Sequence, residues 1–404
     1  MKGLPHKVLL LYTRKTVLSL ALIMREKSSH FGLILLTLAL LTANGANAQP
    51  KFIKKLFSSH DTTRASTFLP IPIISYAEET GLAFGLTGLF SFYVDREDLS
   101  NRNSTISAEA EYSTENQMVV FLKSDIWSKG NRYHYTTDIR YTYFPFYFYG
   151  IGNQTNEVDK DLVLEKIRSV TLEAEKRFGN IFYTGLHTNF GSYSFAEKNA
   201  GGLFSTDPSI NSRTGGHAFF LGVSQVVDNR NSNVYTTAGS YLKLHYSFSP
   251  HFFGEDNFTG SIIKVDASSF KSLSPKLVLG VNGTFKTIQG AYIPFYLLPQ
   301  LGNDMIMRGY YTGRYRDQNL VALQTELRYR FIPRVAVTTF VSAGNVYSNG
   351  NFAFDNNKYS IGAGAQYFFD VARGLSLRAD FAIGEKKAGE SRQDNLYITI
   401  GQSF

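Results

Sequence analysis

The stretch from Val321 to Phe331 alternates apolar and polar side chains without a break. One parity includes Leu323 and Leu327, and the other includes Glu326. A period of two predicts a β-strand with one apolar and one polar face. In a soluble protein the apolar face would enter a core, whereas in a membrane barrel it would contact lipid and the charged face would line a lumen.

The same alternation recurs along most of the chain, separated by turn residues. Sixteen strands are predicted: 70–76, 81–93, 104–113, 117–127, 132–148, 166–178, 181–194, 215–226, 239–248, 258–270, 277–289, 320–331, 335–347, 359–369, 375–385 and 395–404. Short and long connections alternate between them, and an even number of strands returns both barrel ends to the same side of the membrane. No segment after residue 48 offers the roughly 20 consecutive apolar residues that a membrane helix needs.

The composition favours a transmembrane antiparallel β-barrel that spans residues 68–404. The chain has 25 Tyr, 33 Phe and 34 Gly but no Cys. Tyr and Phe suit both a pleated surface and the aromatic girdles at membrane interfaces. The alternative all-β fold, a soluble sandwich or propeller, would need a second packed layer that the periodicity does not show.

The N-terminal 48 residues predict a secretory signal peptide. They contain six Lys/Arg, the apolar run 31–41 and a small-residue site at 46–48, and translation could instead begin at Met24. Residues 49–67 are predicted to be a periplasmic linker, too short for a core of their own, so no folded module is expected before the barrel. The remaining chain has 35 basic and 32 acidic residues, which gives no reason to expect nucleic-acid binding.

Four segments carry a resemblance to a known family. They are PIPIISYAEETGLAFG at 70–85, FPFYFYGIGN at 144–153, MRGYYTGRYRDQN at 307–319 and the Phe-terminated last strand. The chain resembles the BamA/TamA superfamily, also called the bacterial surface antigen family. The resemblance implies an integral barrel in the outer membrane of a Gram-negative bacterium, with the loop 291–319 folded into the lumen as a plug.

In that family the arginine of the loop motif, here Arg308-Gly309-Tyr310, pairs with acids on the twelfth and thirteenth strands. Glu326 matches the first acid, and a guanidinium provides a bidentate fork for a carboxylate. Ser342 stands where the second acid is expected, so Asp380 is a candidate replacement.

The alternative for these residues is less specific. Arg308 could lie in a surface loop, with Gly309 as an ordinary turn residue. Glu326, Arg378 and Asp380 would then be general polar residues of a lumen.

The resemblance also implies a function in inserting other membrane proteins or exporting a polypeptide. In the family, the first and last strands pair weakly at a seam. Pro70 and Pro72 suit such a seam because each lacks a backbone donor, and Phe404 is expected beside them as the terminal aromatic residue. The implied partners are outer-membrane lipid and a polypeptide substrate, with a separate partner protein or a homodimer to recruit the substrate.

Two other functions remain open from the sequence: a passive diffusion channel and a membrane anchor for a partner protein. Enzyme chemistry is not predicted, because the eight His residues show no metal-ligand spacing and no nucleotide-binding or nucleophile motif occurs in a suitable context. No catalytic residue, metal or cofactor is therefore expected.

Overall fold

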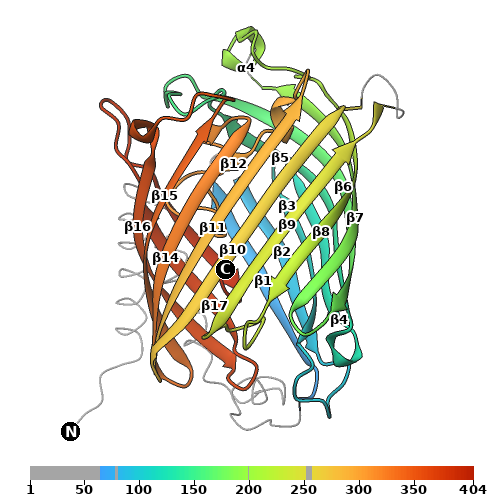
Figure 1. Ribbon diagram of the computed structural model, residues 1–404. Coiled ribbons are helices and arrows are strands. Elements are labelled where there is room, and N and C mark those ends of the chain that lie inside the picture. The colour runs from blue at the N-terminus through green and yellow to red at the C-terminus, as the bar shows by residue number, and fades with distance from the viewer. Residues whose placement is uncertain (1–63, 78–80, 199, 252–256) are drawn as a thin grey trace, which may run out of the picture.

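The computed structural model describes residues 64–77, 81–198, 200–251 and 257–404. Within these ranges, a single antiparallel sheet of 16 strands follows the order of the chain and curves into a barrel of tilted strands (Figure 1). The strands are β1 (Thr67–Ala77), β2 (Gly81–Phe92), β3 (Ser104–Ser113), β4 (Met118–Trp127), β5 (Tyr133–Phe148), β6 (Asp161–Phe178), β7 (Phe182–Glu197), β8 (Gly215–Asp228), β9 (Gly239–Ser249), β10 (Gly260–Ser274), β11 (Leu277–Gly290), β14 (Asn319–Ile332), β15 (Val335–Tyr347), β16 (Lys358–Asp370), β17 (Leu375–Ile383) and β18 (Asp394–Ile400).

The predicted β-barrel of sixteen strands is confirmed, with three notable differences in strand length. β6 begins at Asp161 rather than at 166, and β10 continues to Ser274 rather than ending at 270. Both extensions lengthen a hairpin, where the added residues pair with a neighbouring strand except Leu273, which lies at a register shift. β18 ends at Ile400 instead of continuing to the last residue.

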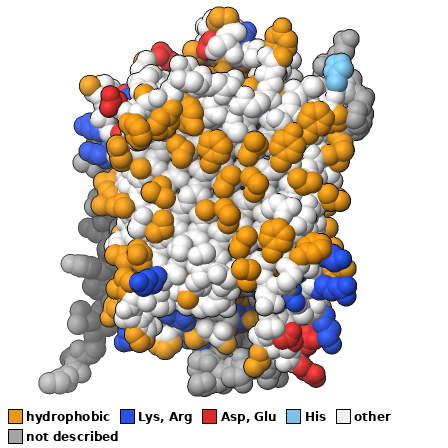
Figure 2. Space-filling model, in the orientation of Figure 1, with side chains coloured by type: hydrophobic (Ala, Val, Ile, Leu, Met, Phe, Trp, Pro, Cys, Tyr) orange, Lys and Arg blue, Asp and Glu red, His pale blue; other side chains and the backbone are white. Residues whose placement is uncertain are grey.

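The barrel has an apolar outer face and a polar interior. In β14, Leu323 is 51% exposed and Leu327 is 41% exposed, whereas Gln324, Glu326 and Arg328 between and beside them are fully buried. Figure 2 shows hydrophobic side chains distributed over the outer wall and most charged side chains near its two ends. This arrangement is typical of a barrel whose outer wall contacts lipid.

The first and last strands approach each other around an apolar cluster. Leu69 and Ile71 of β1 pack in the same cluster as Leu375 of β17 and Ile400 of β18. At the end of β1, the Thr67 hydroxyl donates to Asp370 of β16 at 3.3 Å. The two edges of the sheet therefore approach each other at the end of the barrel where β1 begins.

The connections differ strongly between the two ends of the barrel. Residues 275–276 and 333–334 form tight turns at one end, while the other end carries long loops, including one with the short helix α4 (Leu203–Thr206), which lies at the top of Figure 1. The predicted signal peptide at 1–48, and the predicted linker at 49–67 up to residue 63, lie outside the described residues. Among the described residues, no helix is long and apolar enough to cross a bilayer.

Candidate functional site

The loop between β11 and β14, residues 291–318, folds into the lumen; we call it the lid loop. It contains the short helix η3 (Phe295–Leu297) and the two-residue strands β12 (Gln300–Leu301) and β13 (Tyr315–Arg316). Phe295, Leu301, Met307 and Tyr310 are completely buried. Phe295 packs with Phe148 and Val163 of the wall, so the lid loop and the wall together form the apolar part of the barrel interior.

Arg308 anchors the lid loop to the wall formed by β14 and β17. Its guanidinium lies 2.7 Å from Oε2 of Glu326 and 2.6 Å from Oδ2 of Asp380. It also stacks on the ring of Phe340, with 3.4 Å from Cζ to the ring centroid. Because Arg308 and both carboxylates are essentially inaccessible to solvent, these ion pairs are shielded from screening by salt.

Two further arginines complete a buried cluster of five charges. Nε of Arg328 lies 2.6 Å from Oε1 of Glu326, and Nε of Arg378 lies 2.7 Å from Oδ2 of Asp380. Arg378 also pairs with Glu326. Three guanidinium groups thus share two carboxylates, and Glu326 contacts all three of them.

Ser342 does not contact Arg308 directly. It lies opposite Gln324 in the β14–β15 ladder, and its hydroxyl donates to Oε1 of Gln324 at 3.3 Å. The same amide oxygen accepts a hydrogen bond from Nε of Arg308 at 3.2 Å. Gln324, which the sequence analysis did not select, thereby links Ser342 to Arg308, and Asp380 supplies the second acid.

Gly309 brings the lid loop against the last strands. Its backbone has a φ of +100°, and its N–H donates to the Tyr397 hydroxyl of β18 at 3.0 Å. The neighbouring Tyr310 hydroxyl donates to the Tyr359 carbonyl at 2.8 Å and accepts from the Glu385 N–H. Burial raises the pKa of the Tyr310 hydroxyl, so this group stays protonated and can donate its hydrogen bond well above neutral pH.

Replacing Gly309 with alanine is expected to loosen this contact. A Cβ at this position would lie 2.9 Å from Cβ of Ser360, and the positive φ disfavours L-residues. The left-handed conformation alone costs about 1–2 kcal/mol, so thermal unfolding of the purified barrel should occur at a lower temperature. The matched control is Gly350→Ala in an exposed turn, which has the same sign of φ (+79°) but no neighbour within 4 Å of the added Cβ. Equal effects of the two substitutions would show that the contact with Ser360 contributes nothing.

Residues 99–404, well over half of the chain, match the Omp85 superfamily domain. The chain belongs to the Omp85 superfamily. It is therefore an integral outer-membrane β-barrel of the Omp85 type. A comparison with curated proteins finds no significant sequence match.

Solved structures share the fold of this Omp85 barrel at low sequence identity. BamA from Haemophilus ducreyi lacking POTRA domains 1–3 is 14% identical, with a TM-score of 0.52 over 84% of this chain and 70% of that chain. CdiB from Acinetobacter baumannii is 11% identical, with a TM-score of 0.51 over 83% and 59%. CdiB from Escherichia coli is 10% identical, with a TM-score of 0.51 over 85% and 64%. The Omp85 barrel thus spans less than two thirds of each CdiB chain.

Pro70 and Pro72 lie on β1, opposite Gly88 and Leu86 of β2. Because they are two residues apart on one strand, their missing donors fall along the same edge of β1. β1 is the first strand in the hydrogen-bonded order of the sheet. The structure therefore places both prolines on an edge strand.

Phe404 does not lie on the last strand, so its predicted position at the seam is wrong. The chain turns after Ile400 at Gly401, whose φ is +97°, and Phe404 packs against Phe270 of β10 with ring centroids 6.0 Å apart. Nη2 of Arg328 donates to the Phe404 main-chain oxygen at 3.0 Å. These contacts with the buried Phe270 and Arg328 hold the tail away from the strand edge.

Two arginines later in the lid motif were also missed by the sequence analysis. Nη2 of Arg314 lies 3.0 Å from Oε2 of Glu390, which ties the lid loop to the connection between β17 and β18. Arg316 is buried against the rings of Phe146, Phe148 and Phe295. Burial lowers the pKa of Arg316 to about 10, which is still high enough to leave the guanidinium charged at neutral pH. The Arg-x-Arg pair at 314–316 was the available signal.

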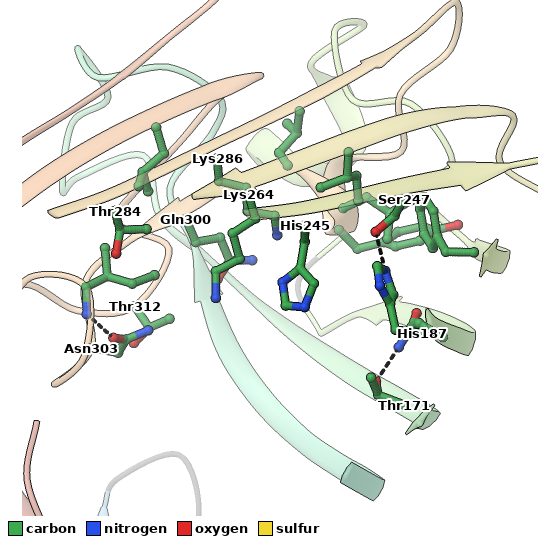
Figure 3. A pocket seen from close by; sticks show the side chains of 18 of the residues that line it. Thr171, His187, His245, Ser247, Lys264, Thr284, Lys286, Gln300, Asn303 and Thr312 are labelled. Atoms are coloured by element: carbon green, nitrogen blue, oxygen red, sulfur yellow. Dashed lines mark hydrogen bonds between the residues drawn. The ribbon is translucent and has the colours of Figure 1, made fainter. Parts of the chain in front are cut away.

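A chamber of about 540 Å³ separates the lid loop from the opposite wall of the Omp85 barrel. Thr171, His187, His245 and Lys286 of the wall line it together with Gln300, Asn303 and Thr312 of the lid loop (Figure 3). The lid loop is therefore anchored by charges to the β14–β17 wall and leaves a space, lined by both polar and apolar side chains, along β6, β7, β9, β10 and β11.

Proposed function

We propose that this Omp85 barrel assists the insertion or translocation of polypeptides at the outer membrane. The observation that supports this function best is the contact of the lid loop with the strands at the edge of the sheet. Arg308 binds Asp380 of β17, and Gly309 binds Tyr397 of β18. A polypeptide that displaces the lid loop would remove these contacts and weaken the last two strands at the same time.

The strands at the seam support the same proposal. β18 has seven residues and is the shortest strand of the large sheet, and β1 carries Pro70 and Pro72. A short strand and missing donors limit the number of hydrogen bonds that the two edges can form with each other. Recruitment of the substrate would fall to a partner protein or to a second copy of the chain.

A seam lock tests this function in cells. Thr67→Cys with Asp370→Cys would link β1 to the β16–β17 hairpin, because the Thr67 hydroxyl and the Asp370 carboxylate are 3.3 Å apart and the chain has no other Cys. The control is Asp266→Cys with Thr284→Cys, a Thr–Asp pair 3.1 Å apart inside the regular β10–β11 ladder.

Depletion of the protein is expected to cause selective loss of other barrels or of one exported protein from the outer-membrane proteome. The oxidised seam lock should reproduce this loss, and a reductant should reverse it, whereas the control lock should behave as the unmodified protein. An unchanged proteome after depletion would contradict the function, and full activity of the oxidised seam lock would contradict opening at the seam.

The chamber favours a second candidate, a passive diffusion channel. A barrel of this size can hold water, and a partly polar space already exists beside the lid loop. In that case the lid loop would only narrow a pore that is always open. The intact protein would then show a high and steady ion conductance in planar bilayers. The third function is a membrane anchor. In that case depletion would leave the outer-membrane proteome unchanged, the intact protein would show no wide conductance in planar bilayers, and crosslinked pull-downs would retain a partner protein.

A further inference from the structure

Three side chains of types that can bind metal ions lie close together in the chamber, on the wall opposite Arg308. Glu173 of β6, His187 of β7 and His245 of β9 each offer a ligand atom, and these atoms all lie within 4.8 Å of one another. Both histidines line the chamber beneath the lid loop (Figure 3). We propose that Glu173, His187 and His245 bind a divalent transition-metal ion such as Zn²⁺ inside the barrel, independently of the function proposed above.

Within the described part of the chain, His187 has one ring nitrogen held by a hydrogen bond and the other without one. Its Nε2 hydrogen-bonds the Ser247 hydroxyl at 2.7 Å, which fixes the ring. Its Nδ1 is buried and has no hydrogen-bond partner among the described residues. Histidines that bind metals usually use one ring nitrogen for the ion and the other for an orienting hydrogen bond. An unpartnered nitrogen in a partly polar chamber therefore marks an available metal ligand.

His245 and Glu173 provide the other two ligands. Nε2 of His245 lies 2.8 Å from Oε1 of Glu173. This is a hydrogen-bond distance, and a tetrahedral ion with ligand bonds of about 2.0–2.2 Å would need the two atoms to move apart slightly as it replaces the proton that they share. The other oxygen of Glu173 is occupied by Nζ of Lys243 at 2.7 Å, so Glu173 would bind the ion through Oε1 alone.

The lysines around the site and the type of its ligand atoms affect which ion it would bind. Lys243 also lies 2.8 Å from Oε1 of Glu175, and Lys264 lies 2.7 Å from Oδ2 of Asp266. Both therefore have a carboxylate partner other than Glu173. The remaining positive charge, from Lys286 in the chamber lining, disfavours ions that depend on charge attraction alone. Imidazole nitrogens favour zinc, copper or nickel over calcium and magnesium, which prefer oxygen ligands.

Zn²⁺ titration of the full chain in detergent tests the site. The protein is purified without a histidine tag, stripped with a chelator and titrated by calorimetry. One Zn²⁺ per chain is expected, with the affinity lowered at least about tenfold in His187→Ala and in His245→Ala. His251→Ala, in an exposed loop, is the matched control and should bind as the unmodified chain does.

A second measurement separates metal binding from a folding defect. Heat-modified migration on gels shows whether each variant has formed the barrel, and Zn²⁺ should raise the unfolding temperature of the unmodified chain and of His251→Ala only. Co²⁺ should produce visible absorption bands that are lost in the two site variants. Absence of bound Zn²⁺ in the unmodified chain would overturn the proposal, as would equal affinity in folded His187→Ala and His245→Ala barrels.

Discussion

Glu326→Gln is expected to destabilise the barrel by about 3–5 kcal/mol, because removing one partner of a buried ion pair leaves charges without compensation. Glu326 contacts the guanidinium groups of Arg308, Arg328 and Arg378, and all four side chains are fully buried. After the substitution, Asp380 would be the single carboxylate in the cluster, and it contacts Arg308 and Arg378 but not Arg328. The amide has nearly the same volume as the carboxylate, so the lost stability is due to the missing charge and not to a cavity.

Urea-induced unfolding of the refolded barrel in detergent measures this loss. Glu115→Gln is the matched control, since Glu115 is an exposed acid in the turn between β3 and β4, and its substitution should change the free energy of unfolding by less than about 0.5 kcal/mol. Limited proteolysis at neutral pH should also cut the lid loop of Glu326→Gln first, because Arg308 would lose one of its two carboxylates. Equal unfolding curves for the two variants would show that the cluster does not hold the lid loop.

Removing the lid loop is expected to raise single-channel conductance at least about tenfold, because a barrel of this size is wide enough to hold water once its interior is empty. Residues 291–318 would be replaced by a short Gly/Ser linker. Such a linker closes easily because Thr287 of β11 and Asn319 of β14 are paired neighbours. Planar-bilayer recording measures the change.

The control is a deletion in another loop. The tip at 351–355, between β15 and β16, is exposed throughout, so its removal should leave the conductance near that of the intact protein. A high conductance in the intact protein, with little further gain after the deletion, would favour the diffusion channel over a plugged barrel.

The strands of this barrel were accessible from the sequence because their pattern is local. Leu323, Glu326 and Leu327 occupy alternate faces of one strand, and such alternation needs only neighbouring residues to be recognised. The outward direction of the apolar face also followed from the sequence, since sixteen alternating segments without a helical partner leave lipid as the surrounding medium. The resemblance at 307–319 added the loop that enters the lumen.

Contacts across the lumen depended on the tertiary structure. Asp380 lies on the fifteenth strand of the barrel, 72 positions from Arg308, and only the curvature of the sheet brings it to the lid loop. The metal ligands show the same limit, because Glu173, His187 and His245 belong to three strands and have no regular spacing in the chain.

Phe404 illustrates why the last strand was misjudged. Alternation predicts a strand as far as the chain alternates, but a terminal segment leaves the sheet when buried contacts elsewhere stabilise it more. Phe270 and Arg328 provide those contacts from β10 and β14, far from β18 in the sheet order. The sequence by itself determined which segments become strands and which face meets lipid, since both follow from short-range periodicity. Only the curvature of the sheet decided which side chains meet in the lumen, because those partners are distant in the chain.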